Sequence, residues 1–239
     1  MYFDNIAKKW DNPRRIERAK IIAKEISRSL DNVEIKSAME FGCGTGLIAF
    51  NLVDNIKNLT LIDNSEEMIQ VVNKKISDFN FKNVKSICDN ITDMKIKDTY
   101  DAIYSSMSLH HIVNVKKIIG KLYHLLDDNG VLCIVDLDEE DGRFHKNEEG
   151  FNGHNGFNQQ WLKEVVEEVG FKNITSRTFY NGIKNIDGED VQYSLFILSA
   201  LKKNWIFKYV ECIEQGTSMM AQGTDEEFSP YLCLVTSNL

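Results

Sequence analysis

The chain has 239 residues, of which 43% are hydrophobic, and it carries a formal net charge of −8. This length and composition suit one sizeable hydrophobic core and exclude a disordered chain. The acidic balance argues against a general nucleic-acid binder, because no basic patch would neutralise phosphates. No apolar run is long enough to span a bilayer and the N-terminus lacks the apolar region of a signal peptide, so we expect a cytoplasmic protein.

The predicted elements alternate along the chain. Apolar periodicity and capping residues predict helices over residues 12–30, 46–53, 65–76, 115–126 and 158–169. Short apolar runs predict strands over residues 37–41, 58–62, 84–88, 100–104, 130–136, 173–179 and 193–200. An Asn129-Gly130 turn opens the fifth strand, and Asn181-Gly182 and Asp187-Gly188 lie between the last two.

This order predicts an α/β fold. Strands alternate with helices through residue 136, which indicates right-handed crossovers and a doubly wound, mostly parallel sheet with helices on both faces. The last two strands follow each other without a helix, so we expect them to pair antiparallel. No linker rich in proline or serine divides the chain, which favours one main domain over residues 1–201.

Residues 202–239 fall outside this plan and form a C-terminal extension of unknown role. Trp205, Ile206, Tyr209, Val210 and Ile213 suit an amphipathic helix, and residues 231–235 suit a strand or a buried tail. The extension would cover the sheet edge or make a homodimer contact.

The five cysteines are scattered, with no CxxC pair and no Cys/His cluster. We therefore predict neither a disulfide framework nor a metal site. Cys43, Cys88 and Cys133 lie in or beside apolar runs, and we expect them to be small buried residues in a reducing compartment.

A glycine-rich turn joins the first predicted strand to the following helix. The strand ends at Glu40, three glycines follow at positions 42, 44 and 46, and the second strand ends at Asp63. Glycine lets a ligand approach the backbone closely, and a helix opening after Gly46 would direct its free N–H groups at that ligand. An acid at the end of the second strand is placed to accept hydrogen bonds from ribose hydroxyls. The stretch therefore predicts a nucleoside-cofactor site.

The glycine spacing bears on which cofactor binds. The dinucleotide fingerprint needs a small residue where this chain has Leu47, which is a poor match. The pattern Glu40-x-Gly42-x-Gly44-x-Gly46 instead resembles the first motif of the class I S-adenosylmethionine (SAM) dependent methyltransferases.

Over roughly residues 1–200 the sequence is similar to the ubiquinone-biosynthesis-type small-molecule members of that class. The resemblance implies a Rossmann-like seven-stranded sheet of order 3-2-1-4-5-7-6, with the last strand antiparallel. It implies that Asp63 binds the ribose and that Asp89 accepts from the adenine amino group, with Asn90 and Ile91 alongside. Ser106–His111 corresponds to a Ser/Leu-His-His segment of the family. The complete set expected at the cofactor is Glu40, Gly42, Cys43, Gly44, Gly46, Asp63, Asn64, Met68, Asp89, Asn90, Ile91 and Ser105.

Each acid also has a simpler interpretation. Glu40 would contact the ammonium group of SAM, directly or through water, or would only brace the loop. Asp63 and Asp89 are also compatible with turn or capping roles. On the N-terminal segment, which we expect to be a helical cap, Tyr2 and Trp10 either fold over the cofactor or pack on the body.

Methyl transfer from SAM is an in-line displacement that releases a neutral thioether, so the protein mainly positions donor and acceptor. A general base is needed only when the acceptor must lose a proton. No residue pair indicates one, and we name no catalytic residue; the candidates are His111, His145 and His154.

Other function classes remain open. A nucleotide-dependent oxidoreductase is disfavoured by Leu47 and by the lack of a Tyr-x-x-x-Lys pair. An RNA methyltransferase would want a basic surface or an Asn/Asp-Pro-Pro-Tyr type motif after the fourth strand, so a small-molecule acceptor is favoured. A non-catalytic SAM-binding module is the remaining alternative, since fold analogy does not identify the substrate.

Overall fold

A computed structural model describes residues 2–30, 35–95, 98–203, 208–210 and 219–221. The chain divides into two compact units, Met1–Lys203 and Asn204–Leu239. In the second unit the described residues are two short strands, Lys208–Val210 (β8) and Met219–Ala221 (β9), which pair antiparallel.

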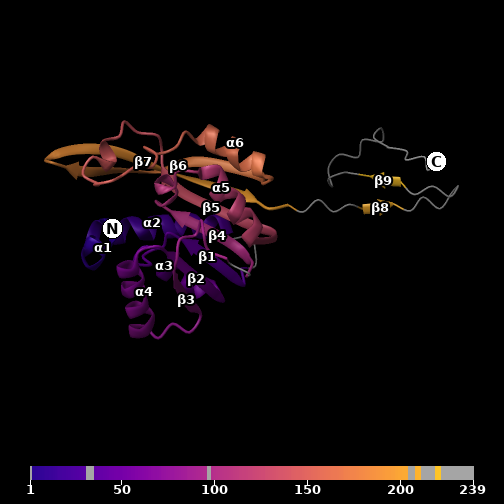
Figure 1. Cartoon of the computed structure of the whole chain (residues 1–239), viewed down its shortest axis with the longest axis horizontal. Coiled ribbons are helices and arrows are strands. Elements are labelled where there is room, and N and C mark those ends of the chain that lie inside the picture. The colour runs from indigo at the N-terminus through magenta and orange to yellow at the C-terminus, as the bar shows by residue number, and fades with distance from the viewer. Residues whose placement is uncertain (1, 31–34, 96–97, 204–207, 211–218, 222–239) are drawn as a thin grey trace. The chain divides into compact units, whose positions relative to one another are not determined.

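The first unit is built on a seven-stranded sheet of order β3-β2-β1-β4-β5-β7-β6 (Figure 1). Its strands are Ser37–Phe41 (β1), Asn58–Asp63 (β2), Val84–Cys88 (β3), Tyr100–Ser106 (β4), Leu126–Leu137 (β5), Lys172–Ile186 (β6) and Glu189–Leu201 (β7). Strands β1 to β5 pair in parallel, whereas β7 is antiparallel to both neighbours. The predicted fold class, strand order and antiparallel last strand are confirmed.

Helices cover both faces of the sheet. They are Tyr2–Ile6 (α1), Pro13–Leu30 (α2), Ala49–Leu52 (α3), Glu66–Asp78 (α4), Val115–Leu125 (α5) and Gln159–Val169 (α6). Short 3-10 turns cover Ala7–Lys9 (η1), Val53–Asn55 (η2), Leu109–His111 (η3) and Arg143–His145 (η4).

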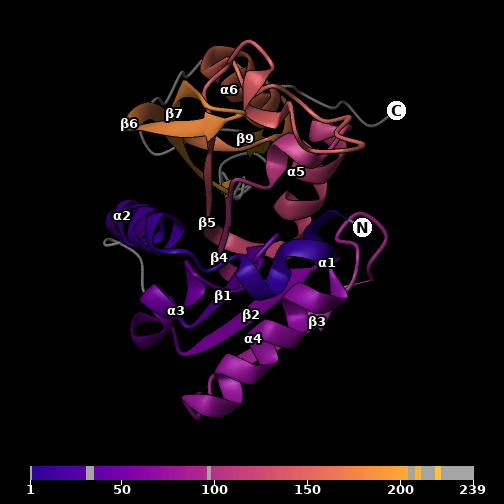
Figure 2. The same cartoon turned by 90° about the vertical axis from the view of Figure 1, so that its left-hand side faces the viewer.

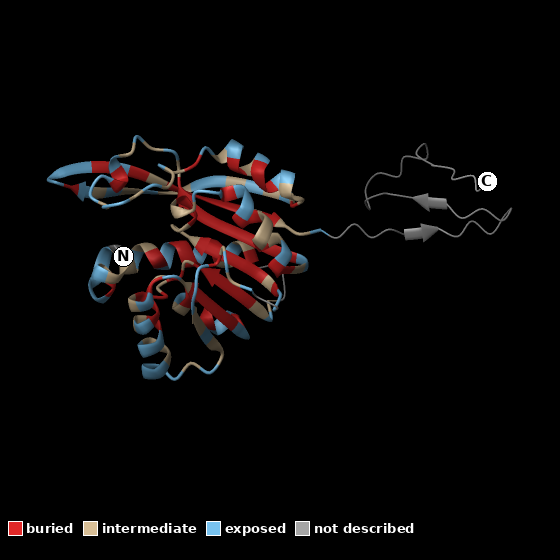
Figure 3. Cartoon of the chain, viewed as in Figure 1, coloured by how far each residue is buried: buried red, intermediate tan, exposed pale blue. Residues whose placement is uncertain are grey.

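The core has two layers because successive strand side chains point to opposite faces. Ala38 packs in the layer under α2, α3 and α4, and its neighbour Met39 packs in the layer under α5 and α6. Both side chains are inaccessible to water, and the central strands are buried over most of their length (Figure 3). Burial on both faces explains why these strands are continuous apolar runs in the sequence.

The third helix is shorter than the predicted 46–53. Gly46 has a φ of +78°, which a right-handed helix does not permit, so residues 46–48 form a turn and α3 begins at Ala49. The predicted bounds of this helix are therefore wrong.

The late hairpin is longer than predicted. Asn181 and Gly182 lie inside β6, paired with Ser194 and Tyr193, so they form no turn. The hairpin turns at Asp187-Gly188, whose φ values of 54° and 86° are those of a type I′ turn. Gly182 is needed for packing, because a Cβ there would lie 2.5 Å from the ring of Tyr193.

Two smaller expectations also need correction. Strand β5 begins at Leu126, so Asn129-Gly130 lies within it, at a shift in its register with β4. Cys88 is exposed because β3 is an edge strand, whereas Cys43 and Cys133 are buried as expected.

The predicted helix after residue 202 is wrong where it can be checked, since Tyr209 and Val210 belong to β8. Trp205, Ile206, Ile213 and residues 231–235 lie outside the described residues. No helix in the described part of the chain combines the length and apolar character of a membrane span.

Candidate active site

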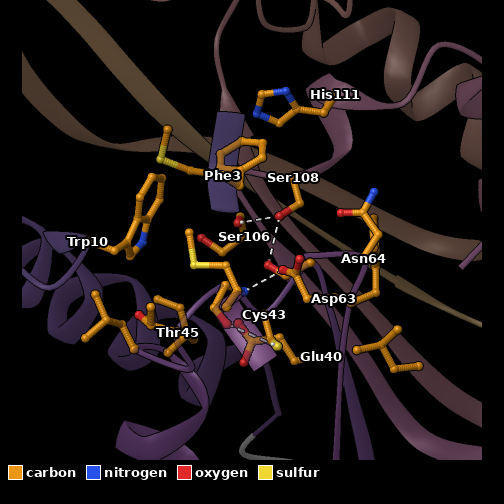
Figure 4. Close-up of a pocket in the computed structure, with 18 of the residues that line it drawn as sticks. Phe3, Trp10, Glu40, Cys43, Thr45, Asp63, Asn64, Ser106, Ser108 and His111 are labelled. Atoms are coloured by element: carbon orange, nitrogen blue, oxygen red, sulfur yellow. Dashed lines mark hydrogen bonds between the residues drawn. The ribbon is translucent and has the colours of Figure 1, made fainter. Parts of the chain in front are cut away.

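A cavity of about 360 Å³ lies at the carboxyl ends of β1, β2, β3 and β4 (Figure 4). This volume is in the range of small-molecule sites, and the position is the crevice where open α/β sheets bind their ligands. The loops after these four strands form one wall. The N-terminal segment and residues 148–152 close the cavity from the other side.

The glycine turn after β1 is held by backbone bonds. Gly42 and Cys43 both donate their N–H groups to the carbonyl of Ile62, at 2.8 and 3.0 Å. Gly42 has a φ of +68°, and a Cβ on it would lie 2.2 Å from the Ser108 hydroxyl oxygen. That hydroxyl donates to the Gly42 carbonyl at 2.9 Å, so a side chain at position 42 would displace the contact that joins β1 to β4.

Asp63 is fixed at the end of β2 by two backbone donors. Its carboxylate accepts from the Gly44 N–H at 2.7 Å and from the Ser65 N–H at 2.9 Å. Burial raises the pKa of Asp63, and these hydrogen bonds oppose the rise. Each carboxylate oxygen has further lone pairs, so Asp63 can accept from a ligand without releasing the glycine turn.

Glu40 lines the same wall and is only 1% exposed. Its Oε2 atom is buried and has no hydrogen-bond partner among the described residues. Burial raises the pKa of Glu40 well above its usual value; the nearby Tyr104 hydroxyl and Ala49 backbone oppose the rise, and the charge of Asp63 adds to it. A buried carboxyl oxygen without a partner is costly, and a cationic ligand group would relieve that cost.

Asp89, Asn90 and Ile91 come to the cavity from the end of β3. The Asp89 backbone N–H donates to the Asp63 carbonyl at 3.0 Å, which places this turn directly beside the β2 turn. The Asp89 carboxylate accepts from the Asn90 N–H at 2.7 Å and is exposed, whereas Ile91 is buried.

Polar contacts tie the N-terminal segment to the cofactor wall. The Ser65 hydroxyl donates to Asp4 at 2.6 Å, and Figure 2 shows α1 beside α4. Asp11 accepts from the Thr45 hydroxyl at 2.5 Å and forms an ion pair with Lys75 at 2.7 Å. The segment is therefore anchored near both of its ends.

Aromatic side chains of this segment complete the cover. Phe3 meets the rings of Trp10 and His111 edge to face, with centroid distances of 5.8 and 5.1 Å. Both Phe3 and Trp10 line the cavity (Figure 4). Trp10 was expected either to fold over the cofactor or to pack on the body, and the structure places its side chain at the cavity. The Tyr2 side chain is not among the described parts of the structure.

Most of the residues expected at the cofactor line this one cavity: Glu40, Gly42, Cys43, Gly44, Asp63, Asn64, Met68, Asp89, Asn90 and Ile91. Gly46 does not, because it is packed on Phe50, where a Cβ would lie 2.6 Å from the ring. Ser105 does not line the cavity either. Side chains alternate along β4, and Ser106 takes its place.

The three histidine candidates have different positions. His111 lines the cavity, and its pKa is lowered to about 3 by burial and by the nearby charge of His110. His145 is buried behind the cavity wall, and burial lowers its pKa to about 3 as well. His154 does not line the cavity, because its ring donates to the Ile112 carbonyl at 3.1 Å and stands beside Phe157.

Sequence reasoning missed several cavity residues. Arg15 and Arg18 line the cavity from α2, where Arg15 stacks on Trp10 at 3.9 Å. Arg15 and Arg18 are three residues apart, so they lie on one face of the helix, and this spacing could have indicated that they act together. Glu148 and Phe151 come from a long polar loop without periodicity, and nothing in the local sequence indicates their position.

The sheet order is that of the Rossmann-like SAM-dependent methyltransferases. The family model described as a methyltransferase domain matches residues 32–194, and the chain belongs to this family.

Relatives agree with this assignment. An uncharacterized methyltransferase of Schizosaccharomyces pombe is 26% identical over 215 residues, covering 70% of this chain and 76% of that protein. Malonyl-[acyl-carrier protein] O-methyltransferase of Bacillus anthracis is 32% identical over 104 residues, covering 43% of this chain and only 38% of that enzyme. The fold is similar to that of the N-methyltransferase NodS from Bradyrhizobium japonicum, solved with S-adenosylhomocysteine: the TM-score is 0.57 at 15% identity, covering 82% of this chain and 91% of that one.

Proposed function

We propose that the protein transfers a methyl group from SAM to a small-molecule acceptor and releases S-adenosylhomocysteine. The observation that carries this proposal is the buried Oε2 atom of Glu40, which has no hydrogen-bond partner among the described residues, in a cavity that Asp63 and Asp89 also line. SAM is a cation with an ammonium group, ribose hydroxyls and an adenine amino group. The wall has three acids, one for each of these donor groups.

The residues fit the cofactor as follows. Glu40 would accept from the ammonium group, Asp63 from the ribose hydroxyls and Asp89 from the adenine amino group. Gly44 would let the ligand pass close to the backbone, because a Cβ there would extend toward Trp10, whose indole nitrogen is 3.8 Å away. Ile91 and Met68 are buried apolar side chains on the same wall, suited to a flat aromatic ring.

SAM supplies a methyl group on a sulfonium, which leaves as a neutral thioether and needs no acid catalyst. The protein has to hold donor and acceptor in line and exclude water. The anchored N-terminal segment supports the second task, because Phe3 and Trp10 cover the cavity. The position of His111 supports a contact with the methyl acceptor, since its ring lines the cavity and is neutral at pH 7.

A small acceptor is favoured by the cover and by the charge. Phe3, Trp10 and Phe151 line a cavity of about 360 Å³, a volume that suits a compact molecule. The net charge of −8 gives no general attraction for a nucleic acid. The named relatives methylate different atoms, an oxygen and a nitrogen, so the acceptor is not inferred from them.

Calorimetric titration of the full chain with SAM, S-adenosylhomocysteine and NAD tests the donor site. We expect the first two to bind and NAD not to bind. Asp63→Ala should weaken SAM binding on the order of 100-fold, the value of one charged hydrogen-bond pair. Asp54→Ala, an exposed acid on η2, is the matched control and should change nothing. Binding of NAD without SAM, or an Asp63→Ala affinity equal to wild type, would contradict the proposal.

A further inference from the structure

Three histidines from two turns that are distant in sequence meet at the wall of the cavity. His110 and His111 belong to η3, after β4, and His145 belongs to η4, after β5. One ring nitrogen of each lies within 4.8 Å of the other two. We propose that His110, His111 and His145 form a binding site for a divalent cation of the Zn²⁺ class.

The first support is a buried nitrogen without a partner. His145 is 5% exposed, and its Nδ1 atom has no hydrogen-bond partner among the described residues. The ring is stacked on Phe151 with a centroid distance of 3.9 Å and an interplanar angle of 7°, so its plane is fixed. Leaving such an atom unpaired costs free energy, and a metal ion would supply the missing partner.

The second support is the carboxylate behind His110. Asp136, which is inaccessible to water, lies 2.5 Å from His110 Nδ1 and also accepts from the His110 backbone N–H at 3.2 Å. This occupies Nδ1 and leaves Nε2 as the atom that can bind a cation. Metal-binding histidines are regularly oriented by a carboxylate in this way, which also raises the basicity of the ring.

The donor set suits a metal as well, because each of the three side chains offers an imidazole nitrogen. Three imidazoles without thiolates favour Zn²⁺ or Co²⁺ over the oxygen-seeking Mg²⁺ and Ca²⁺. Around Zn²⁺ the nitrogens would stand about 3.3 Å apart, so the rings must approach from their present separation of up to 4.8 Å.

The site would have an open side toward the cavity. His111 and Glu148 line the cavity and lie 3.4 Å apart, whereas His110 and His145 do not line it. Three protein ligands leave a fourth position, as in catalytic zinc sites. An ionisable oxygen or sulfur of the methyl acceptor would fit there and would release its proton to solvent on binding. This last step rests on the proposed function, whereas metal binding does not.

Cobalt titration of the EDTA-treated, desalted full chain tests the site without SAM. We expect one equivalent of Co²⁺ to produce the visible bands of a tetrahedral nitrogen site, with no thiolate charge-transfer band, and Zn²⁺ to displace it. His145→Ala and His111→Asn should each weaken binding by at least about 100-fold. His124→Ala, an exposed histidine on α5, should bind like wild type.

The outcomes are decisive because thermal melts identify which variants are folded. If His145→Ala does not fold, His111→Asn decides, since its ring is on the cavity wall and not in the core. Absence of the bands in wild type, a thiolate band, or a folded variant that binds as tightly as wild type would overturn the proposal. Because SAM binding is measured separately, failure here leaves the methyl-donor site untouched.

Discussion

Acidification should destabilise the fold through His111 and His145. Burial holds the pKa of each at about 3, against 6.5 for an ordinary histidine. Above pH 6.5 the folded and unfolded chains are both neutral at these positions. Below pH 6.5 these two rings bind protons in the unfolded chain but not in the folded chain. The free energy of unfolding therefore falls as the pH falls toward 3.

The magnitude follows from the proton balance. One pKa unit corresponds to about 1.36 kcal/mol, and pH 5 lies about 1.5 units below the unfolded value, so each ring costs about 2 kcal/mol between pH 7 and pH 5. Any folded pKa below about 4 gives the same figure, because the ring is then neutral at pH 5. The His111 side chain is 24% exposed, so its share is the smaller. Together the two account for about 3–4 kcal/mol.

Urea denaturation at pH 7 and pH 5, with EDTA present to remove metal ions, measures this loss. His145→Gln cannot be protonated and should lose about 2 kcal/mol less than wild type between the two pH values. His111→Gln should lose slightly more than His145→Gln, and exposed His124→Gln should follow wild type. Equal losses in wild type and both buried-site variants would show that these rings are protonated in the folded state.

Three further changes test other parts of the structure. Glu40→Gln should weaken SAM binding by about 10- to 100-fold in calorimetry, because the ammonium group loses a charged acceptor. The substitution should not lower stability, because it removes a buried acid whose Oε2 atom has no partner among the described residues. A variant that binds SAM as tightly as wild type would contradict the proposed ammonium contact. Gly42→Ala should lower the free energy of unfolding by about 2–4 kcal/mol, since its Cβ would lie 2.2 Å from Ser108 Oγ. The control is Gly150→Ala, which has a φ of +78° and no atom within 4 Å of the added Cβ, so it should cost only the backbone strain. Equal losses for the two variants in urea denaturation would refute the clash at Gly42. Asp11→Ala should speed tryptic cleavage at the N-terminal lysines by releasing its contacts with α4 and the glycine turn; an unchanged cleavage rate would show that the segment is held by its aromatic contacts.

The features that could be predicted are those that depend on local sequence patterns. Strands β1 and β3 have the predicted bounds. Strand β1 is buried from Ala38 to Phe41, as expected of a central parallel strand, whereas β3 is an edge strand without a fully buried residue. The placement of Glu40, Asp63 and Asp89 follows from the same logic, since side chains after parallel strands meet at one edge of the sheet. The roles of these acids toward SAM stay predictions.

The parts that escaped prediction depend on distant contacts. His145 follows His111 by 34 residues, and the polar loop between β5 and α6 has no periodicity that would place it. Only the pairing of β4 with β5 brings the two turns together. Gly46 was missed for a local reason: its positive φ keeps it out of a right-handed helix, and glycine adopts that conformation without a steric cost.

The sheet order explains why the two kinds of side chain meet in one cavity. The chain runs from β1 outward to β2 and β3 and then returns to β4 on the other side of β1, so the crevice opens between β1 and β4. Glu40, Asp63 and Asp89 follow the strands on one side of this switch point, and the imidazoles follow those on the other, where Glu148 also lines the cavity. Under the proposed function, the cationic donor would bind on the side of the three acids and the acceptor on the side of the imidazoles. A substitution on either side should then alter mainly the binding of one substrate.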